Sequence, residues 1–256
     1  MSVCDILTYL WCRRLPAYTT GGGSISGDDN RLVLSKGHSV PALYALASVT
    51  GQLSFEELGG FRKMGSRLQG HPDVSSIEWL ETSTGSLGQG FSFGAGLALG
   101  KKLRNNSGQV FAVLGDGELQ EGQVWETAMF ASHRKLDNFV AIVDRNLLQS
   151  DSSTEIVMGL EPLEDKWRSF GWNLVRFNGH SFSEIESALA LSQHSKQPTV
   201  LVADTVKGKG IDFMEGVPSW HGSVKITASQ FEDGLKQLGV PDSEQEHIRE
   251  LIGGLL

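Results

Sequence analysis

The segment Val110-Phe111-Ala112-Val113-Leu114-Gly115-Asp116-Gly117-Glu118 decides the fold of this 256-residue chain. Its five leading apolar residues have the length of a buried strand, and a Gly-Asp-Gly turn follows at once. A second apolar run, residues 139–143, leads into Asn146-Leu147-Leu148. Each strand end therefore delivers one oxygen ligand, and the first strand also opens into a helix. A carboxylate, an amide oxygen and a helix N-terminus together predict a site for a divalent cation bound to a diphosphate.

The predicted site matches the ligand preferences of magnesium. Mg²⁺ takes six oxygens at about 2.0–2.1 Å, commonly one or two from the protein and others from substrate phosphates. Asp116 supplies charge, Asn146 supplies a neutral oxygen, and the backbone carbonyl of Leu148 is suitably placed to be a third ligand. Gly117 leaves room for the diphosphate, and the helix expected to begin near Glu121 offers its N-terminal partial charge. A Gly-Asp-Gly turn alone is a weak signal, but Asn146 at the next strand end favours the metal site over an ordinary turn.

Alternating apolar runs and helical patterns predict an α/β fold, with a parallel sheet that carries helices on both faces. Further strands are expected at 173–177 and 199–203. Helices are expected at 1–15, 40–49, 54–63, 89–104, 121–135, 163–170, 183–194, 228–238 and 243–251. The Gly- and Ala-rich helix at 89–104 indicates close packing, within the fold or across a subunit interface. The glycine-rich stretch 19–30 is expected to be a flexible surface loop. We expect one domain spanning residues 1–256, with ligands at the carboxyl ends of the strands.

Composition excludes several classes of partner. The formal charge is −8, from 30 acidic and 22 basic residues, which argues against nucleic acid and against an anionic membrane. The two cysteines, Cys4 and Cys12, are too far apart along one helix to pair, so free, buried thiols in a reducing compartment are expected. No signal-peptide pattern or membrane-length apolar run occurs. These features predict a soluble cytoplasmic protein.

Five further motifs occur in a fixed order. They are Leu34-Ser35-Lys36-Gly37-His38, Gly70-His71-Pro72, Thr84-Gly85-Ser86-Leu87-Gly88-Gln89-Gly90, Lys207-Gly208-Lys209-Gly210 and Trp220-His221-Gly222. With the Gly-Asp-Gly and Asn elements, the chain closely resembles the thiamine-diphosphate-binding domain of transketolase. It is most similar to the separate N-terminal subunit of split transketolases, from about Val3 to the C-terminus.

The resemblance implies a cofactor and its ligands. The cofactor is thiamine diphosphate with Mg²⁺ or Ca²⁺, and Asp116, Asn146 and the Leu148 carbonyl hold the metal. The resemblance also implies the residues that contact the cofactor, which are Gly117 and His221 at the diphosphate, Gly85 at the aminopyrimidine through its backbone, and Leu87 against the rings.

It further implies catalytic residues. His38, His71 and His221 line the substrate channel, and Glu121 and Glu126 join a carboxylate network that links active sites across a subunit interface. A histidine exchanges protons near neutrality because its ordinary pKa is about 6.5.

Each of these residues also has a plainer interpretation. A histidine beside glycine commonly belongs to a turn, but three histidines in matching motifs favour the site. Glu121 and Glu126 also suit the first turns of a helix. Lys207 and Lys209 are consistent equally with phosphate screening and with a simple turn. The remaining histidines, His133, His180 and His194, lack a motif and are expected to be solvated.

The chain departs from the family pattern in several places. The Gly-His-Pro-Gly-Gly-Ser segment that precedes the first helix in the family is not in this sequence. Ser150 stands where an isoleucine usually packs beside the cofactor, and the stretch 19–30 differs from the usual approach to the Leu-Ser-Lys-Gly-His motif. The family's pyrimidine-binding domain, whose glutamate activates the cofactor, is also absent. We therefore expect that domain on a separate C-terminal transketolase subunit in an α₂β₂ assembly, and expect this chain to be inactive alone.

The predicted function is transfer of a two-carbon ketol unit from a ketose donor to an acceptor. Central sugar-phosphate metabolism and a specialised biosynthetic pathway, for example one with a carrier-protein thioester acceptor, both fit, with a modest preference for the second. Alternatives are a subunit of an E1-type 2-oxoacid dehydrogenase and a non-catalytic paralogue that only binds a partner. The motifs at 84–90 and 207–222 argue against the dehydrogenase, and the intact metal ligands argue against the paralogue.

Overall fold

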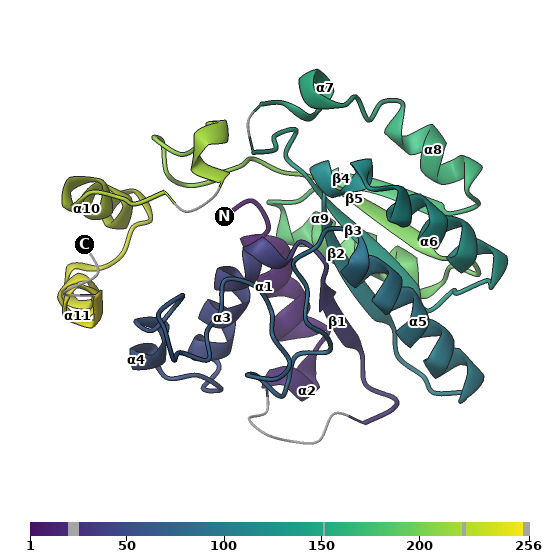
Figure 1. Ribbon diagram of the computed structural model, residues 1–256, viewed down its shortest axis with the longest axis horizontal. Helices are drawn as coiled ribbons and strands as arrows, with labels where there is room; N and C mark the ends of the chain where they lie inside the picture. The colour runs from purple at the N-terminus through teal and green to yellow at the C-terminus, as the bar shows by residue number, and fades with distance from the viewer. Residues whose placement is uncertain (20–25, 151, 222–223, 253–256) are drawn as a thin grey trace.

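The computed structural model describes residues 1–19, 26–150, 152–221 and 224–252. Within these ranges, five parallel strands form one sheet in the order β1-β2-β3-β5-β4 (Figure 1). The strands are β1 (Arg31–Leu34), β2 (Val110–Gly115), β3 (Phe139–Arg145), β4 (Asn173–Asn178) and β5 (Thr199–Asp204). The predicted parallel α/β fold is therefore confirmed.

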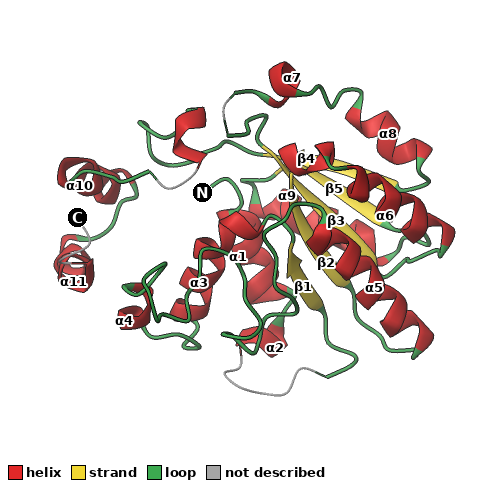
Figure 2. Ribbon diagram, viewed as in Figure 1, coloured by secondary structure: helices red, strands yellow, loops and turns green. Residues whose placement is uncertain are grey.

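Helices cover both faces of the sheet, as the secondary-structure view shows (Figure 2). One face carries α1 (Cys4–Arg13), α2 (Pro16–Thr19), α3 (Val40–Val49) and α9 (Phe182–Gln193). The other carries α5 (Gln89–Leu103), α6 (Gly122–His133) and α8 (Leu163–Ser169). The remaining helices are α4 (Phe55–Leu58), α7 (Thr154–Val157), α10 (Ala228–Gln237) and α11 (Asp242–Ile252), of which α10 and α11 stand apart from the sheet. None of the described helices combines the length and apolarity that a membrane span requires.

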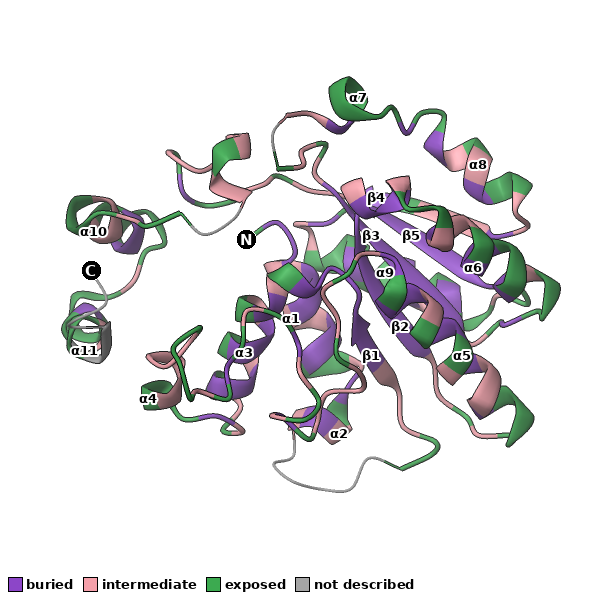
Figure 3. Ribbon diagram, in the orientation of Figure 1, coloured by how far each residue is buried: buried purple, intermediate pink, exposed green. Residues whose placement is uncertain are grey.

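The core consists of two apolar layers separated by the sheet. In β2, Phe111 and Val113 belong to the layer under α1 and α3, while Val110, Ala112 and Leu114 belong to the layer under α5 and α6. All five are fully buried, and the central strands β2 and β3 are buried along their length, whereas the edge strand β4 is partly exposed (Figure 3). Because both faces are covered, the central strands appear in the sequence as unbroken apolar runs.

Several local expectations need correction. Strand β1 was not predicted, because its four residues lie between the glycine-rich stretch and the Leu-Ser-Lys-Gly-His motif. The helix expected at 54–63 ends at Leu58, before Gly59-Gly60, although the Ser54–Glu57 capping box is present. The cysteine thiols are not buried, since Cys12 is exposed and Cys4 is half-buried.

Part of the stretch 19–30 lies outside the described residues, and the described part is anchored. Lys101 donates to the carbonyls of Gly27 and Asp29, the latter at 2.9 Å. Asn30 accepts a 2.7 Å hydrogen bond from the Gln109 amide. Residues 27–30 are therefore bonded to the rest of the domain rather than forming a free surface loop.

The glycines of α5 show which side of this helix packs tightly. A Cβ added at Gly90 would lie 2.7 Å from the Ser35 Cα, and one at Gly94 would lie 3.0 Å from the Phe139 ring. Positions Gly96 and Gly100 have open space instead. The close packing predicted for this helix is thus present within the fold, at Gly90 and Gly94.

Gly90→Ala is expected to lower the free energy of unfolding by about 1–3 kcal/mol, because the new methyl group meets backbone rather than a movable side chain. The matched control is Gly96→Ala in the same helix, which should raise stability by about 0.5–1 kcal/mol by restricting the unfolded chain. Urea denaturation of both variants measures the difference. Equal stabilities for the two variants would contradict the packing argument.

Candidate functional site

A pocket of about 220 Å³ opens at the carboxyl edge of the sheet. It is lined by segments at the ends of β1, β2 and β3, together with Leu87 from the loop before α5 and His221 from the short helix η3 (Pro218–His221). The predicted site residues among its lining are His38, Leu87, Asp116, Gly117, Glu121, Asn146, Leu148 and His221. The other predicted residues, His71, Gly85 and Glu126, do not line it.

Asp116 is held at the exit of β2 by backbone amides. Its Oδ1 accepts from the Gly117 amide at 2.8 Å and its Oδ2 from the Leu147 amide at 2.6 Å. The carboxylate is 2% exposed. Burial and the nearby Asp144 raise the pKa of Asp116, while Arg145 and the two amides oppose that rise. The side chain is therefore fixed in position before any ligand binds.

The donor set fits a divalent cation. Asn146 lies beside Asp116 at the next strand exit, and its Oδ1 accepts only one hydrogen bond among the described residues, from the Leu148 amide at 3.1 Å. Asp116 Oδ1 likewise accepts one, so both oxygens keep a lone pair. The described residues contain no cluster of three or more His, Cys, Asp or Glu side chains that could hold a metal. This site is therefore suited to a cation that takes its other ligands from a bound anion.

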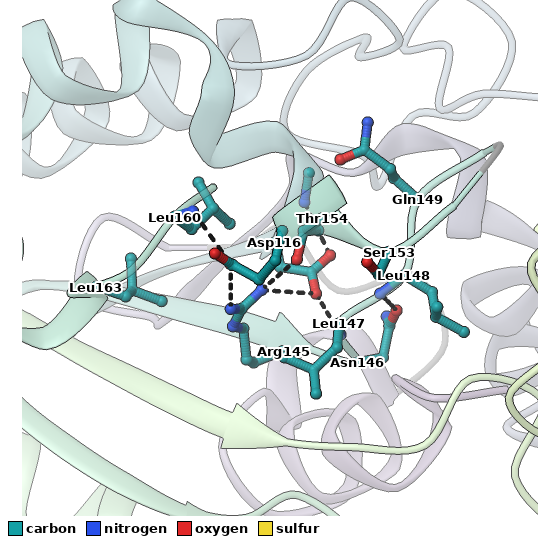
Figure 4. Close-up of polar contacts among 12 residues, drawn as sticks. Asp116, Arg145, Asn146, Leu147, Leu148, Gln149, Ser153, Thr154, Leu160 and Leu163 are labelled. Atoms are coloured by element: carbon teal, nitrogen blue, oxygen red, sulfur yellow. Dashed lines mark hydrogen bonds and ion pairs between the residues drawn. The ribbon is translucent and has the colours of Figure 1, made fainter. Parts of the chain in front are cut away.

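Arg145, which the sequence analysis did not single out, links the metal ligands to the next loop (Figure 4). Its guanidinium, 1% exposed, lies 3.5 Å from Asp116 Oδ2 and donates to the Thr154 hydroxyl at 2.8 Å. The second terminal nitrogen of the guanidinium, Nη2, donates to Glu155 at 3.1 Å and to Glu161 at 3.0 Å. An arginine after an apolar strand gives no sequence signal for this role, because its partners lie up to 29 residues away.

Short helical turns shape the edge of the pocket. The expected helix near Glu121 does not follow the Gly-Asp-Gly turn directly, because a 3₁₀ turn, η2 (Gly117–Gln120), comes first. Glu121 is then the N-cap of α6 and lines the pocket. The Gly117 amide donates to Asp116, and a Cβ on Gly117 would lie 3.2 Å from the Gln149 Cβ. Gly117 thus permits a close approach of two loops at the site.

Two of the predicted histidines face one another beside a lysine. The rings of His38 and His221 have centroids 5.0 Å apart. Lys207 Nζ lies 2.5 Å from His221 Nδ1. Because a protonated lysine can only donate, His221 Nδ1 accepts and the ring proton lies on Nε2.

Burial and nearby positive charge lower the pKa of His38 and of Lys207. Loss of hydration and the charge of Lys36 lower the pKa of His38 to about 3, although the residue is exposed at the surface. Burial and the charge of Lys36 lower the pKa of Lys207 to about 8. His38 is therefore neutral near pH 7, with one ring nitrogen as donor and the other as acceptor.

His71 and Gly85 lie together, outside the lining of the pocket. A Cβ on Gly85 would lie 3.4 Å from the His71 ring, and His71 is close enough to His38 to contribute to lowering its pKa. The side chain of His71 is exposed. The His71 ring thus lies in van der Waals range of the Gly85 position.

A buried ion pair adjoins the pocket. Lys36, which lines the pocket, contacts Asp144 Oδ2 at 2.5 Å, with side-chain exposures of 6% and 0%. Asp144 also accepts from the Ser2 hydroxyl at 2.6 Å and from the Thr205 hydroxyl. Burial opposes ionisation of Asp144, but the Lys36 charge and these hydrogen bonds outweigh it and lower its pKa to about 2. This polar cluster joins α1, the β1 exit, β3 and the β5 exit.

His180 corrects one sequence expectation. Its side chain is only 12% exposed rather than solvated. Nδ1 lies 2.7 Å from Asp5 Oδ2, and Nε2 accepts the Val206 amide at 2.8 Å. His180 thus fixes the backbone next to Lys207. His133 and His194 are exposed, as expected, and so is Glu126 on α6.

The chain matches one protein family and is similar to several transketolases and transketolase subunits. The chain matches the family described as transketolase, thiamine diphosphate binding domain, over residues 1–252. It is 38% identical over 239 residues to the 6-deoxy-6-sulfo-D-fructose transketolase subunit of Clostridium sp. strain MSTE9, covering 93% of this chain and 86% of the relative. It is 40% identical over 210 residues to an apulose-4-phosphate transketolase subunit of Phocaeicola vulgatus, covering 82% of this chain and 74% of that relative.

Single-chain transketolases are similar over part of their length. Human transketolase is 39% identical over 227 residues, which cover 84% of this chain and 36% of the human protein. The crystal structure of transketolase from Campylobacter jejuni superposes with a TM-score of 0.83 at 28% identity, covering 98% of this chain and 42% of that one. The chain thus spans well under half of these proteins.

Lys36→Met is expected to lower the free energy of unfolding by about 3–5 kcal/mol at neutral pH, because it leaves the buried Asp144 carboxylate without its cation. Adding Asp144→Asn should recover at least half of that loss by removing the unpaired charge. Urea denaturation of the single and double variants measures both effects. A double variant no more stable than Lys36→Met would count against the ion pair as the cause.

Proposed function

The chain belongs to the transketolase family, as its thiamine-diphosphate-binding domain, and on that basis we propose that it is the cofactor-binding subunit of a split transketolase. The reaction is transfer of a two-carbon ketol unit from a ketose donor to an acceptor. One observation carries the proposal. Asp116, Asn146, Leu148 and His221, which come from distant parts of the sequence, line a single pocket at the carboxyl edge of the sheet.

In this proposal, the metal ligands and the cations act on the diphosphate. Asp116, Asn146 and the Leu148 carbonyl hold Mg²⁺ or Ca²⁺, which neutralises the anion. His221 donates through Nε2–H, since Lys207 occupies its Nδ1. Lys207 adds positive charge beside it. Gly117 keeps the backbone close, Leu87 contacts the rings, and the Gly85 backbone receives the aminopyrimidine.

When bound, thiamine diphosphate would supply the carbanion-stabilising chemistry of ketol transfer, while the protein supplies orientation and electrostatics. The histidines act on the sugar. His38 is neutral near pH 7, so one ring nitrogen donates to a substrate oxygen while the other accepts a hydroxyl proton. His71 and His221 orient the remaining hydroxyls and the carbonyl. Glu121, at the pocket, and Glu126, exposed on α6, form the carboxylate network toward a partner.

The partner is a separate C-terminal transketolase subunit that carries the pyrimidine-binding domain, in an α₂β₂ assembly located in the cytoplasm. The lengths of the relatives support a separate partner. The chain covers most of two relatives that are named as transketolase subunits, but only 36% of human transketolase. Those two relatives are named for 6-deoxy-6-sulfo-D-fructose and apulose 4-phosphate, which are anionic sugars. We therefore extend the proposal to an anionic ketose donor in a specialised pathway. The relatives are transketolases, so nothing favours an E1-type dehydrogenase.

Saturating thiamine diphosphate with Mg²⁺ is expected to stabilise the complex of this chain and its partner subunit. At 100 times the dissociation constant, the gain is about 2.7 kcal/mol, seen as a rise in Tm. Asp116→Ala should abolish the gain, because it removes the only charged metal ligand in the proposed set. An unchanged Tm for the wild-type complex would favour the non-catalytic paralogue.

The purified chain alone is expected to show no two-substrate turnover, because the pyrimidine-binding domain, proposed to lie on the partner subunit, completes the cofactor site. Mixing it with the partner subunit should produce ketol transfer that saturates at a 1:1 ratio. A coupled assay with anionic ketose donors and aldehyde acceptors measures this. Robust turnover by the chain alone would refute the split-enzyme proposal.

A further inference from the structure

Glu118 is a buried carboxylate that neither the metal site nor the histidine group uses. It lies two residues after Asp116, lines the pocket and is 1% exposed. We propose that Glu118 is a positioning residue that fixes three cofactor-binding segments relative to one another. This inference rests on the proposed function, because its consequence is the affinity for thiamine diphosphate.

The hydrogen bonds of Glu118 reach three separate segments. Oε1 accepts from the Ser35 hydroxyl at 2.5 Å and from the Gly88 amide at 2.8 Å. Oε2 accepts from the Gly115 amide at 3.0 Å. One side chain thus joins the β1 exit, the start of α5 and the end of β2.

Each donor lies close in sequence to a proposed site residue. Gly88 follows Leu87 and Gly115 precedes Asp116, while Ser35 is three residues before His38 and next to Lys36. Gly88 is the N-cap of α5, and its backbone is left-handed, with φ 80°. This conformation sets the direction of the Gly88 amide at the point where the helix begins. Any shift of Glu118 therefore changes the spacing between the metal carboxylate, the residue that contacts the cofactor rings and a histidine of the substrate channel.

The chemistry of these contacts requires a carboxylate. All three partners donate, and an ionised carboxylate is the side chain that accepts through both of its oxygens. Two of the donors are backbone amides, so no side-chain replacement elsewhere can supply the missing partner. A glutamine has nearly the same shape but presents one NH₂ group to a donor. That leaves one buried N–H unpaired, which is costly in a site shielded from water.

Glu118 acts through its neighbours rather than as a ligand. Its two oxygens already accept three described hydrogen bonds, and Asp116 and Asn146 supply the cation ligands. The contact of Thr84 with the Leu34 carbonyl, at 2.8 Å, also ties the β1 exit to the loop before α5. The segments therefore remain associated without Glu118, and the expected defect is in their relative position rather than in folding.

The test compares Glu118→Gln with wild type in the complex with the partner subunit. Direct titration of thiamine diphosphate at saturating Mg²⁺, followed by intrinsic tryptophan fluorescence, gives the dissociation constant. We expect Glu118→Gln to weaken binding at least tenfold, about 1.4 kcal/mol. The KM for the cofactor should rise equally, while kcat at saturating cofactor stays within twofold. The matched control is Glu232→Gln, which removes an exposed carboxylate paired with Arg249 on another part of the chain and should leave both constants unchanged.

The outcomes separate the inference from the proposed function. If wild type does not bind thiamine diphosphate, the proposed function fails. If wild type binds and Glu118→Gln binds within twofold of it, the positioning role is overturned. A lower Tm without the cofactor together with an unchanged dissociation constant also overturns it, since that pattern marks a purely structural residue. If Glu118→Gln does not fold, Ser35→Ala decides, with a two- to fivefold loss of affinity supporting the role and none overturning it.

Discussion

The adjacency of β1, β2 and β3 in parallel register is the constraint on which the site depends. Leu34 pairs with Val113, and Gly115 pairs with Asp144, so these three strands end at one edge. Parallel strands place all of their following loops on that edge. Residues that are more than 100 positions apart in the sequence, such as Lys36 and Asp144, therefore meet there. The pocket follows from the order of the strands before any particular side chain is considered.

A layer of buried ionic groups adjoins the pocket, and Lys36, Asp116 and Glu118 are among its lining residues. Lys36 with Asp144, Glu118 with its three donors, and Arg145 with Asp116 each join segments that leave different strands. Burying charge costs desolvation, so such groups are weak sources of net stability. They are better suited to fixing relative positions, because each has directional partners. The sheet brings the loops after its strands close together, and this layer of ionic groups then fixes the loops in one defined arrangement.

The two lysines near the pocket differ in how their charge is balanced, and the difference fits an anionic ligand. Lys36 is neutralised by Asp144, whereas Lys207 lies beside the neutral His221 and has a pKa lowered to about 8 by burial and by Lys36. An anion placed there would favour the protonated lysine. His180, which binds Asp5 and the Val206 amide, holds the backbone that carries Lys207. The loop after β5 therefore contributes to the site although no metal ligand lies on it.

The sequence by itself determined the α/β class, four of the strands, most of the helices that cover them and eight of the residues that line the pocket. Strand periodicity, glycine turns and ordered motifs are local signals, so they can be read from the chain. Only the tertiary structure decided the roles of Arg145, Glu118, the Lys36–Asp144 pair and His180. Their partners are brought close by the strand order, and a lone charged residue in a sequence looks the same whether it meets solvent or a buried partner. Strand β1 was missed for the same reason, since four residues become a strand only through pairing with β2.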